Sequence, residues 1–259
     1  MRDDGLDRAI DAAGGVARLA RKIGVSQPSV SSWSKVPAQR VIAVEAATGV
    51  SRNQLRPDLY SEPLMSEWPI DPVDAARAQE YLLLASLLSA APSKRLLDQL
   101  AALIGDGTPL GRAHAALAEA AAGAVAAKVE REYFDLFVGL GRGELLPYAS
   151  YYLTGFLNER PLSRLRSDLA ALGIERVAGN FEPEDHAAIL CEIMAGFAGG
   201  RFAASSDAQR TFFEKQVAPW MGRLFADIES AESATFYRAV GALGRAFIEI
   251  ETKAFTFAN

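Results

Sequence analysis

The chain downstream of Val73 carries apolar residues at helical spacing, without the alternation of apolar and polar residues that marks a half-buried strand. Ala and Leu are abundant there and runs rich in Val, Ile or Thr are scarce, which favours helix. The expected helices cover residues 73–90, 93–104, 109–137 with a break near Gly123, 162–172, 183–202, 207–228 and 235–255. The pattern therefore predicts an all-α domain over residues 73–259.

Residues 1–60 form a separate set of short helices joined by tight turns. An amphipathic helix over residues 6–13 ends at Gly14-Gly15, and a second over residues 16–23 ends at Gly24. Ser26 is a good N-cap for a third helix, and Pro28 suits its first turn. A helix, a short Gly-containing turn and a second short helix make the helix-turn-helix plan, so we expect that fold for residues 1–60.

The third helix of this segment would present small polar side chains that can reach the base edges of DNA, while nearby cations can contact phosphates. The helix has no Arg of its own, so base readout would depend on amide and hydroxyl groups that match adenine or several bases. One copy of so small a unit would bind weakly, so DNA binding also predicts a homodimer. The candidate base-contacting residues are Gln27, Ser29, Ser31, Ser32 and Ser34, with Lys35 just beyond, and the candidate phosphate contacts are Arg18, Arg21, Lys22 and Arg40.

This region resembles the Cro/YdaS type of phage-repressor helix-turn-helix. The resemblance is carried by VARLARKIGVSQPSVSSW at residues 16–33 and by TGVSRNQLRPDLY at residues 48–60. It implies operator DNA as a partner. The alternative is a helix-turn-helix retained for packing or for protein contact, with no operator, because short patterns of this kind also occur without DNA binding.

The charge of the chain is divided unevenly between its two parts. Residues 1–57 hold nine Lys and Arg against five Asp and Glu, whereas the rest of the chain holds 18 against 27. A basic front and an acidic back suggest two units with different partners. Between them, SEPLMSEWPIDP at residues 61–72 has three prolines and no helical period, so we expect a linker there.

The remaining features of the composition favour a protein of the reducing cytoplasm. Cys191 is the single cysteine, so no disulfide can form within one chain. The N-terminus is charged from residue 2 and lacks the apolar stretch of a secretory signal, and no uncharged apolar run is long enough to span a bilayer. The sequence also lacks a Gly-rich phosphate loop, a His/Cys cluster with zinc spacing and a nucleophile elbow, so we expect no enzyme, no cofactor and no metal site.

Three segments of the C-terminal part depart from plain helix chemistry. EYFDLFVGLG at residues 132–141 ends an apolar helical patch abruptly at two glycines, and PYASYY at residues 147–152 sets three tyrosines around a serine. EPEDHAAILCEIMAGF at residues 182–197 reads as a helix with Pro183 in its first turn and three carboxylates at its positive end. His186 heads the apolar stripe of that helix, which indicates either a functional pocket or a capped core helix.

Taken in order, these segments resemble the TorD/DmsD/NarJ family of redox-enzyme maturation chaperones. The series is E-Y-x-x-L-F-x-G-x-G, then P-Y-x-S-x-Y, then E-P-x-D-H followed by L-x-x-x-M, and finally Phe213 with Pro219-Trp220. The resemblance covers most of residues 73–259. Two positions depart from the family pattern: Leu140 stands where the family usually has Pro, and Gln216-Val217 stand where it usually has His-Leu.

The resemblance implies a chaperone that binds the apo form of a molybdenum-cofactor oxidoreductase, often through its twin-arginine signal peptide, until the cofactor is inserted. Carboxylates at the 182–186 segment could take guanidinium groups, and the tyrosines with the apolar stripe could take the apolar part of the peptide. The implied client-binding residues are Tyr148, Ser150, Tyr151, Tyr152, Glu182, Asp185 and His186, with Glu184 beside them.

Two other interpretations compete with a chaperone. Asp185 beside His186 could suggest acid–base catalysis, but adjacent helix residues point about 100° apart, and the other histidine, His114, has no obvious partner in the sequence. The stronger competitor is a transcription regulator whose helical C-terminal domain senses a ligand or a client in a polar-lined pocket. A fusion could combine both roles, with the client-free chaperone reporting on expression of the enzyme's genes.

Overall fold

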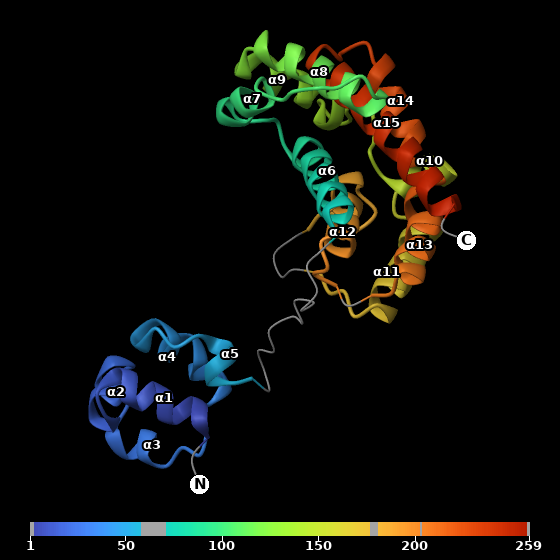
Figure 1. Cartoon of the computed structure of the whole chain (residues 1–259). Helices are drawn as coiled ribbons and strands as arrows, with labels where there is room; N and C mark the ends of the chain where they lie inside the picture. Colours follow the sequence, from blue (N-terminus) through green and yellow to red (C-terminus); the bar gives the residue numbers. More distant parts are fainter. Residues whose placement is uncertain (1–2, 58–70, 177–180, 203, 258–259) are drawn as a thin grey trace. The chain divides into compact units, whose positions relative to one another are not determined.

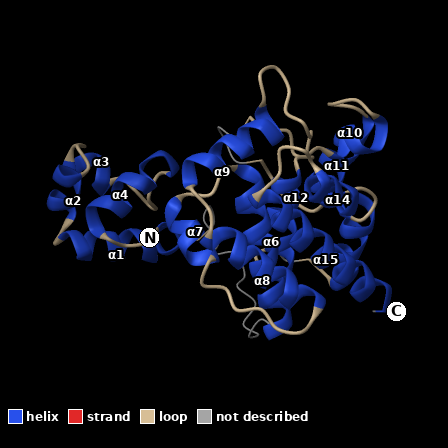
Figure 2. Ribbon diagram, turned by 90° about the horizontal axis from the view of Figure 1, so that it is seen from above, coloured by secondary structure: helices blue, strands red, loops and turns tan. Residues whose placement is uncertain are grey.

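A computed structural model describes residues 3–57, 71–176, 181–202 and 204–257 (Figure 1). The chain divides into two compact units, Met1–Glu67 and Trp68–Asn259, here called the N-terminal and C-terminal units. Within the described residues both units consist of helices and loops (Figure 2), which confirms the all-α prediction. The one β-type pairing in this part of the chain is an isolated bridge between Tyr148 and His186. The expected linker at 61–72 lies almost wholly outside the described residues.

The N-terminal unit has the expected helix-turn-helix. Ser26 caps α3 by accepting a hydrogen bond from the backbone N–H of Ser29 (3.3 Å), and Gly24 adopts the left-handed conformation that the turn before α3 requires. The side chain of Val30 is fully buried against apolar residues of the other helices of this unit. The helices are α1 (Asp4–Ala13), α2 (Val16–Lys22), α3 (Gln27–Ser31), the 3₁₀ turn η1 (Ala38–Arg40), α4 (Val41–Thr48) and α5 (Arg52–Leu55).

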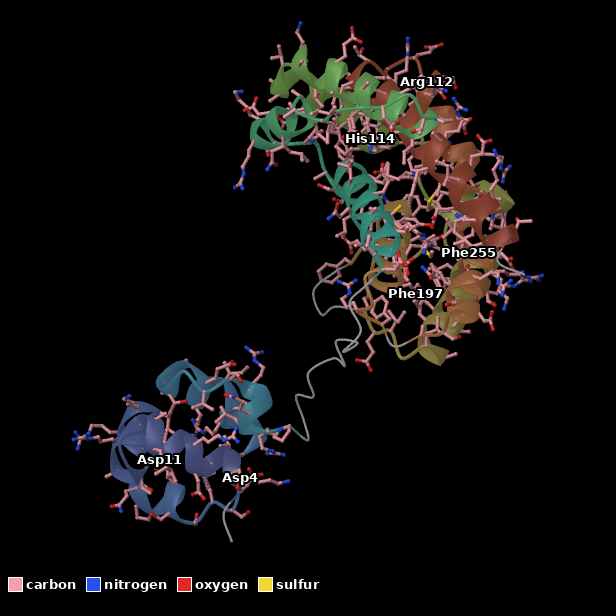
Figure 3. All side chains as sticks on the ribbon, viewed as in Figure 1. Asp4, Asp11, Arg112, His114, Phe197 and Phe255 are labelled. Atoms are coloured by element: carbon pink, nitrogen blue, oxygen red, sulfur yellow. The ribbon has the colours of Figure 1, made fainter. Side chains whose placement is uncertain are left out.

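The C-terminal unit is built around α12 (Ala187–Ala198), whose residues are buried with the exceptions of Ile189 and Glu192. The helix packs against α6, while α15 packs against α14 and α8. Phe197, labelled in Figure 3, lies near the end of α12. Its ring contacts those of Phe202 and Phe212, which ties α12 to the chain that follows it. The other helices are α6 (Pro72–Ser89), α7 (Lys94–Leu100), α8 (Pro109–Ala122), α9 (Ala126–Tyr133), α10 (Ala149–Thr154), α11 (Arg160–Ala171), α13 (Ser206–Phe212), α14 (Met221–Ser230) and α15 (Phe236–Phe257).

Several predicted helix bounds are wrong. The break near Gly123 is confirmed, but the helix expected over 93–104 ends at Leu100. The helix expected over 207–228 is divided into α13, a π-helical turn η3 (Phe213–Val217) and α14, in keeping with the missing N–H of Pro219. Pro72, assigned to the linker, is the first residue of α6, with Asp71 as its N-cap.

The prediction that Pro183 opens the helix of the 182–197 segment is also wrong, because α12 begins four residues later with His186 as its N-cap. The backbone before it pairs with a neighbouring segment: the N–H of Ala149 donates to the carbonyl of Asp185 (3.0 Å), and the N–H of Ala187 donates to the carbonyl of Pro147 (2.8 Å). These bonds flank His186, whose backbone is extended, and the helix begins only at Ala187. The carboxylates at 182, 184 and 185 therefore precede the helix and do not occupy its first turn.

The EYFDLFVGLG segment has a structural role that spacing alone does not reveal. The carboxylate of Glu132 accepts backbone N–H groups at the start of α15, from Thr235 (2.7 Å), Phe236 (3.1 Å) and Tyr237 (2.7 Å). Glu132 therefore satisfies donors that a helix start leaves unpaired. In the same segment, Gly139 ends the π-helical turn η2 (Phe134–Val138) at φ 63°, and a Cβ there would collide with a backbone carbonyl.

Candidate functional site

The bridge between Tyr148 and His186 brings two of the sequence-predicted segments together. The hydroxyl of Tyr148 donates to Oε1 of Glu182 (2.6 Å), and the rings of Tyr148 and His186 meet edge to face, with centroids 5.0 Å apart. Burial, together with the Glu182 carboxylate, raises the pKa of Tyr148, so this hydroxyl stays protonated and remains a donor. The structure thus joins Tyr148, Ser150, Glu182, Asp185 and His186 in one cluster.

Asp185 lies inside this cluster, with 1% of its surface exposed. Its Oδ2 accepts the backbone N–H of Ser150 (2.8 Å) in the first turn of α10, so the carboxylate acts as a cap. Within the described residues, Oδ1 of Asp185 and Oγ of Ser150 are buried without a hydrogen-bond partner. Asp185 therefore holds α10 against the start of α12 and is shielded from a ligand outside the cluster.

His186 caps α12 through its ring. Its Nδ1 accepts the backbone N–H of Ala188 (3.1 Å), which requires that nitrogen to be unprotonated and puts the proton of the neutral ring on Nε2. Burial lowers the pKa of His186, against the opposing charges of Glu182 and Asp185. The ring is therefore held neutral, as a helix cap and a packing partner of Tyr148.

The other two tyrosines of the 147–152 segment face different neighbours. The hydroxyl of Tyr152 donates to Oδ2 of Asp227 on α14 (2.8 Å), and its ring lies 5.5 Å from that of Trp220. The hydroxyl of Tyr151 accepts from Nη2 of Arg142 (3.1 Å). The rings of Tyr151 and Tyr152 are edge to face at 6.1 Å, so these two make a second aromatic group of their own.

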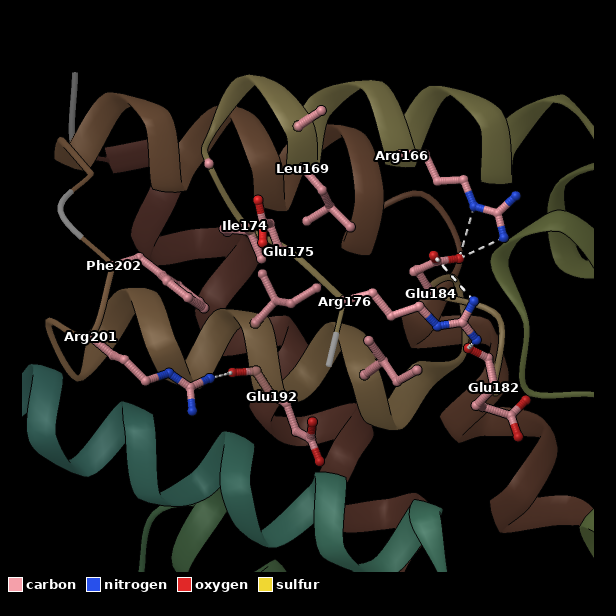
Figure 4. A pocket seen from close by; sticks show the side chains of 14 residues that line it. Arg166, Leu169, Ile174, Glu175, Arg176, Glu182, Glu184, Glu192, Arg201 and Phe202 are labelled. Atoms are coloured by element: carbon pink, nitrogen blue, oxygen red, sulfur yellow. Dashed lines mark hydrogen bonds and ion pairs between the residues drawn. The ribbon is translucent and has the colours of Figure 1, made fainter. Parts of the chain in front are cut away.

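A cavity of about 360 Å³ lies beside the Glu182 end of the cluster, between α11 and α12 (Figure 4). Apolar side chains from both helices and the adjoining segments line it, with Ile189 and Ile193 presenting one face of α12. The predicted stripe is therefore divided, because Leu190 and Met194 on the other face are fully buried in the core. The apolar lining consists of Leu169, Ala170, Ile174, Ile189, Ile193 and Phe202.

Charged groups stand at both ends of this cavity. At one end, Arg166 and Arg176 converge on Glu184; at the other, Arg201 lies over the ring of Phe202, 4.9 Å from its centroid (Figure 4). Burial works to raise the pKa of Glu184, but hydrogen bonding from Arg166 and the charges of both arginines outweigh it and lower that pKa. The carboxylate of Glu184, at this end of the cavity, is therefore ionised.

Sequence reasoning missed the contribution of α11 to this site. Leu169 and Arg166 reach the cavity from a helix that was expected only as a generic amphipathic element, and Ile174 and Arg176 follow it. Their spacing gave no sign of the partner, because Arg166 and Glu184 are 18 residues apart and meet only through the fold.

Two other buried carboxylates of the C-terminal unit, those of Glu80 and Glu251, pair with basic side chains. The expectation that His114 lacks a partner is wrong: its Nε2 lies 2.9 Å from Oε2 of Glu80, and this hydrogen bond raises the pKa of His114. Glu251 is almost fully buried and receives Arg77 on both carboxylate oxygens, each at 2.8 Å. Within the described residues no three His, Cys, Asp or Glu side chains gather as a metal site would need.

The N-terminal unit exposes the residues considered for DNA contact. Gln27, Ser29, Ser31, Ser32 and Lys35 all lie on the surface, as do Arg18, Arg21 and Lys22. Part of this set is engaged locally: the hydroxyls of Ser26 and Ser29 are 2.7 Å apart, and the hydroxyl of Ser32 donates to the carbonyl of Ser29 (2.8 Å). Gln27 and Ser31 present their polar groups without a local bond inside the described part of the chain.

Comparison with known proteins distinguishes the two units. A family model described as nitrate reductase delta subunit matches residues 105–226, and one described as bacterial toxin YdaS matches residues 6–64. The chaperone protein TorD of Aliivibrio fischeri is 30% identical over 200 residues, which cover 68% of this chain and 93% of that protein. The chain belongs to the TorD family of chaperones.

Other TorD relatives match shorter stretches. The TorD protein of Vibrio cholerae is 29% identical over 127 residues, covering 46% of this chain and 58% of its own length. That of Aliivibrio salmonicida is 26% identical over 136 residues, covering 49% and 63%. Among the described helices of this TorD-family chain, none is both long and apolar enough to cross a membrane.

Proposed function

We propose that the C-terminal unit is a cytoplasmic maturation chaperone that binds the apo catalytic subunit of a molybdenum-cofactor oxidoreductase, or its twin-arginine signal peptide, before cofactor insertion. The observation that carries this proposal is the cavity between α11 and α12, which combines an apolar lining with the carboxylates of Glu175, Glu182, Glu184 and Glu192. A signal peptide has the matching arrangement, with arginines next to an apolar stretch. Membership of a chaperone family supports a binding role over catalysis.

The residues of the cluster and of the cavity would have different roles in this proposed site. Glu182 and Glu184 lie at the cavity and supply acceptors for guanidinium groups, while Ile189 and Ile193 take an apolar side chain. Asp185, Ser150 and His186 hold the segment that carries these carboxylates, and Tyr148 orients Glu182 by its hydrogen bond. Tyr151 and Tyr152 extend the proposed surface toward α14.

Isothermal titration calorimetry of the full chain tests this proposal, with a synthetic peptide that has an Arg-Arg pair followed by an apolar run. Ile189→Asp places a charge in the apolar lining, so we expect the affinity to fall at least tenfold, while the helical circular dichroism is kept because Ile189 is only partly buried. Ile250→Asp, at an exposed isoleucine of α15, is the matched control and should bind as the wild type does. Equal affinity of both variants would reject the cavity as the binding site.

A second function is favoured for the N-terminal unit by its match to the YdaS model and by its exposed polar helix α3. We infer that this unit binds operator DNA as a homodimer, with Gln27 and the serines of α3 at base edges and the three cations of α2 on phosphates. Fluorescence anisotropy with duplex DNA over a range of salt concentrations tests it. Replacing Arg18, Arg21 and Lys22 by Gln should reduce the slope of log affinity against log salt by up to about three. An unchanged slope would favour a protein-contact role.

If both proposals hold, the chain would be a regulator in which client binding by the C-terminal unit changes DNA binding by the N-terminal unit. If the client-free chaperone reports on expression of the enzyme's genes, adding the arginine peptide must change the affinity of the full chain for its operator. A titration of DNA binding with and without peptide measures this coupling. A sensor of a small ligand instead would show no response to the peptide and would not co-purify with a large oxidoreductase subunit.

A further inference from the structure

Glu184 already holds guanidinium groups that belong to its own chain. Nε and Nη2 of Arg166 lie 2.9 Å and 2.8 Å from its Oε2, and Nη1 of Arg176 lies 3.7 Å from its Oε1. Arg176 is anchored besides by a hydrogen bond from its Nη2 to the carbonyl of Glu182 (2.6 Å). The Glu184 end of the cavity is therefore covered by two arginine side chains, one from α11 and one from the segment that follows it (Figure 4).

The exposure of these groups shows which of them a ligand would meet first. The side chain of Glu184 is 13% exposed, whereas those of Arg166 and Arg176 are 52% and 36% exposed. The two guanidinium groups thus lie between much of the carboxylate and the solvent. A cationic ligand can pair fully with Glu184 only after at least one of them has moved aside.

The internal pairs are also less than optimal. Both nitrogens of Arg166 approach the same oxygen, and Arg176 faces the other oxygen from beyond hydrogen-bond distance. An incoming arginine can place two parallel N–H groups on the two oxygens, the geometry that makes such pairs strong. Because the side chains of both arginines are partly exposed, moving them aside has a modest cost, which an incoming arginine can offset by making the stronger two-point pair.

We propose that Arg166 and Arg176 are internal competitors for Glu184, and that an arginine of a client peptide enters the cavity by displacing them. The inference rests on the function proposed above and adds its recognition chemistry: a guanidinium group on Glu184, with the neighbouring apolar side chain between α11 and α12. The displaced arginines lower the affinity for every ligand, and a fork-shaped guanidinium overcomes this better than the point charge of a lysine. The competition from Arg166 and Arg176 for Glu184 therefore favours an arginine ligand over a lysine ligand.

Calorimetry with the full chain and two synthetic peptides tests the exchange, one with an Arg-Arg pair before an apolar run and one with Lys-Lys in its place. Arg166→Gln with Arg176→Gln should tighten the Arg-Arg peptide about three- to tenfold, because the internal competition is removed. Arg164→Gln is the control for the loss of positive charge. Arg164 is an exposed residue of α11 that lines a different cavity, so its replacement alters the net charge without touching Glu184. Lys-Lys should bind the wild type more weakly than Arg-Arg.

The dependence on Glu184 is measured by a double-mutant cycle. Glu184→Gln should weaken the Arg-Arg peptide at least tenfold, and in that background Arg166→Gln should have no further effect, because nothing is left to compete for. If the wild type and every variant fail to bind either peptide, the proposed function itself is wrong. If the wild type binds but the Arg166 and Arg176 variants bind equally or more weakly, these arginines do not compete, and only this inference is overturned.

Discussion

Glu184 and Asp185 are consecutive in the chain and carry the same chemical group, yet the fold uses them differently. Asp185 is buried and caps α10 through the N–H of Ser150, whereas Glu184 lies at the end of the cavity under two arginines. Removing the first should disturb folding, and removing the second should disturb binding. Together with the proposed binding role of Glu184, this gives one short motif a structural half and a proposed recognition half, and the following experiments test that division.

The largest effect is expected at the buried carboxylate. Asp185→Ala leaves the N–H of Ser150 without its acceptor inside the protein, so the free energy of unfolding should fall by about 2 kcal/mol. Asp185→Asn keeps an acceptor oxygen and should recover part of that loss. Glu184→Gln, in ion pairs whose arginine partners are partly exposed, should lower the free energy of unfolding by less than about 1 kcal/mol.

Urea unfolding followed by circular dichroism measures these three variants. The proposed difference between the neighbouring carboxylates is wrong if Asp185→Ala and Glu184→Gln lower the free energy of unfolding equally. It is sharpened if Asp185→Ala alters peptide affinity only in proportion to the unfolded fraction, since that is what a positioning residue would do.

The two histidines provide a test by pH, with opposite signs. His186 has a lowered pKa in the folded chain, so the unfolded chain binds more protons; the stabilisation is present above about pH 6.5 and is lost as the pH falls toward the folded value. His114 has a raised pKa, so its contribution is complete below about pH 6.5 and is lost as the pH rises through the folded value.

Unfolding free energies between pH 5 and 8 check this expectation. His186→Gln should flatten the acid side of the stability curve, and His114→Gln should flatten the neutral side. Acid sensitivity that survives in His186→Gln would mean that another group of the cluster titrates in that range.

The smallest effect is expected at Ser150. Its hydroxyl is buried without a partner within the described residues, so Ser150→Ala removes a polar group that the fold leaves unsatisfied. The unfolding free energy should change by less than about 0.5 kcal/mol, in either direction. A loss above 1 kcal/mol would instead reveal an ordered water that joins Ser150 Oγ to Asp185 Oδ1.

Local signals predicted much of the fold. Ser26, Pro28 and Gly24 predicted the helix-turn-helix, because capping and turn chemistry depend on neighbouring residues. The apolar period of residues 187–197 correctly indicated a buried helix, and the order of the three motifs led to the family. These features are short-range, so they can be read without knowing what the segment packs against.

The start of α12 shows what the sequence could not reveal. Pro183 and three carboxylates are an ordinary helix opening, but the backbone of 185–187 pairs with 147–149 and delays the helix to Ala187. In the same way Glu132 caps a helix more than a hundred residues later, and Arg166 reaches Glu184 from another helix. Each contact joins residues far apart in the chain, and no local pattern contains both partners.

The sequence by itself determined that the chain is helical, that a helix-turn-helix precedes a larger α-domain, and that the 147–152 and 182–197 segments belong to a chaperone family. Tertiary structure alone decided that Asp185 is the buried carboxylate of the 182–186 segment, that Tyr148 bonds to Glu182, and that α11 completes a cavity with two arginines over Glu184. The reason is physical: propensity and capping act within a few residues, whereas burial and ion pairing depend on what the whole chain brings together.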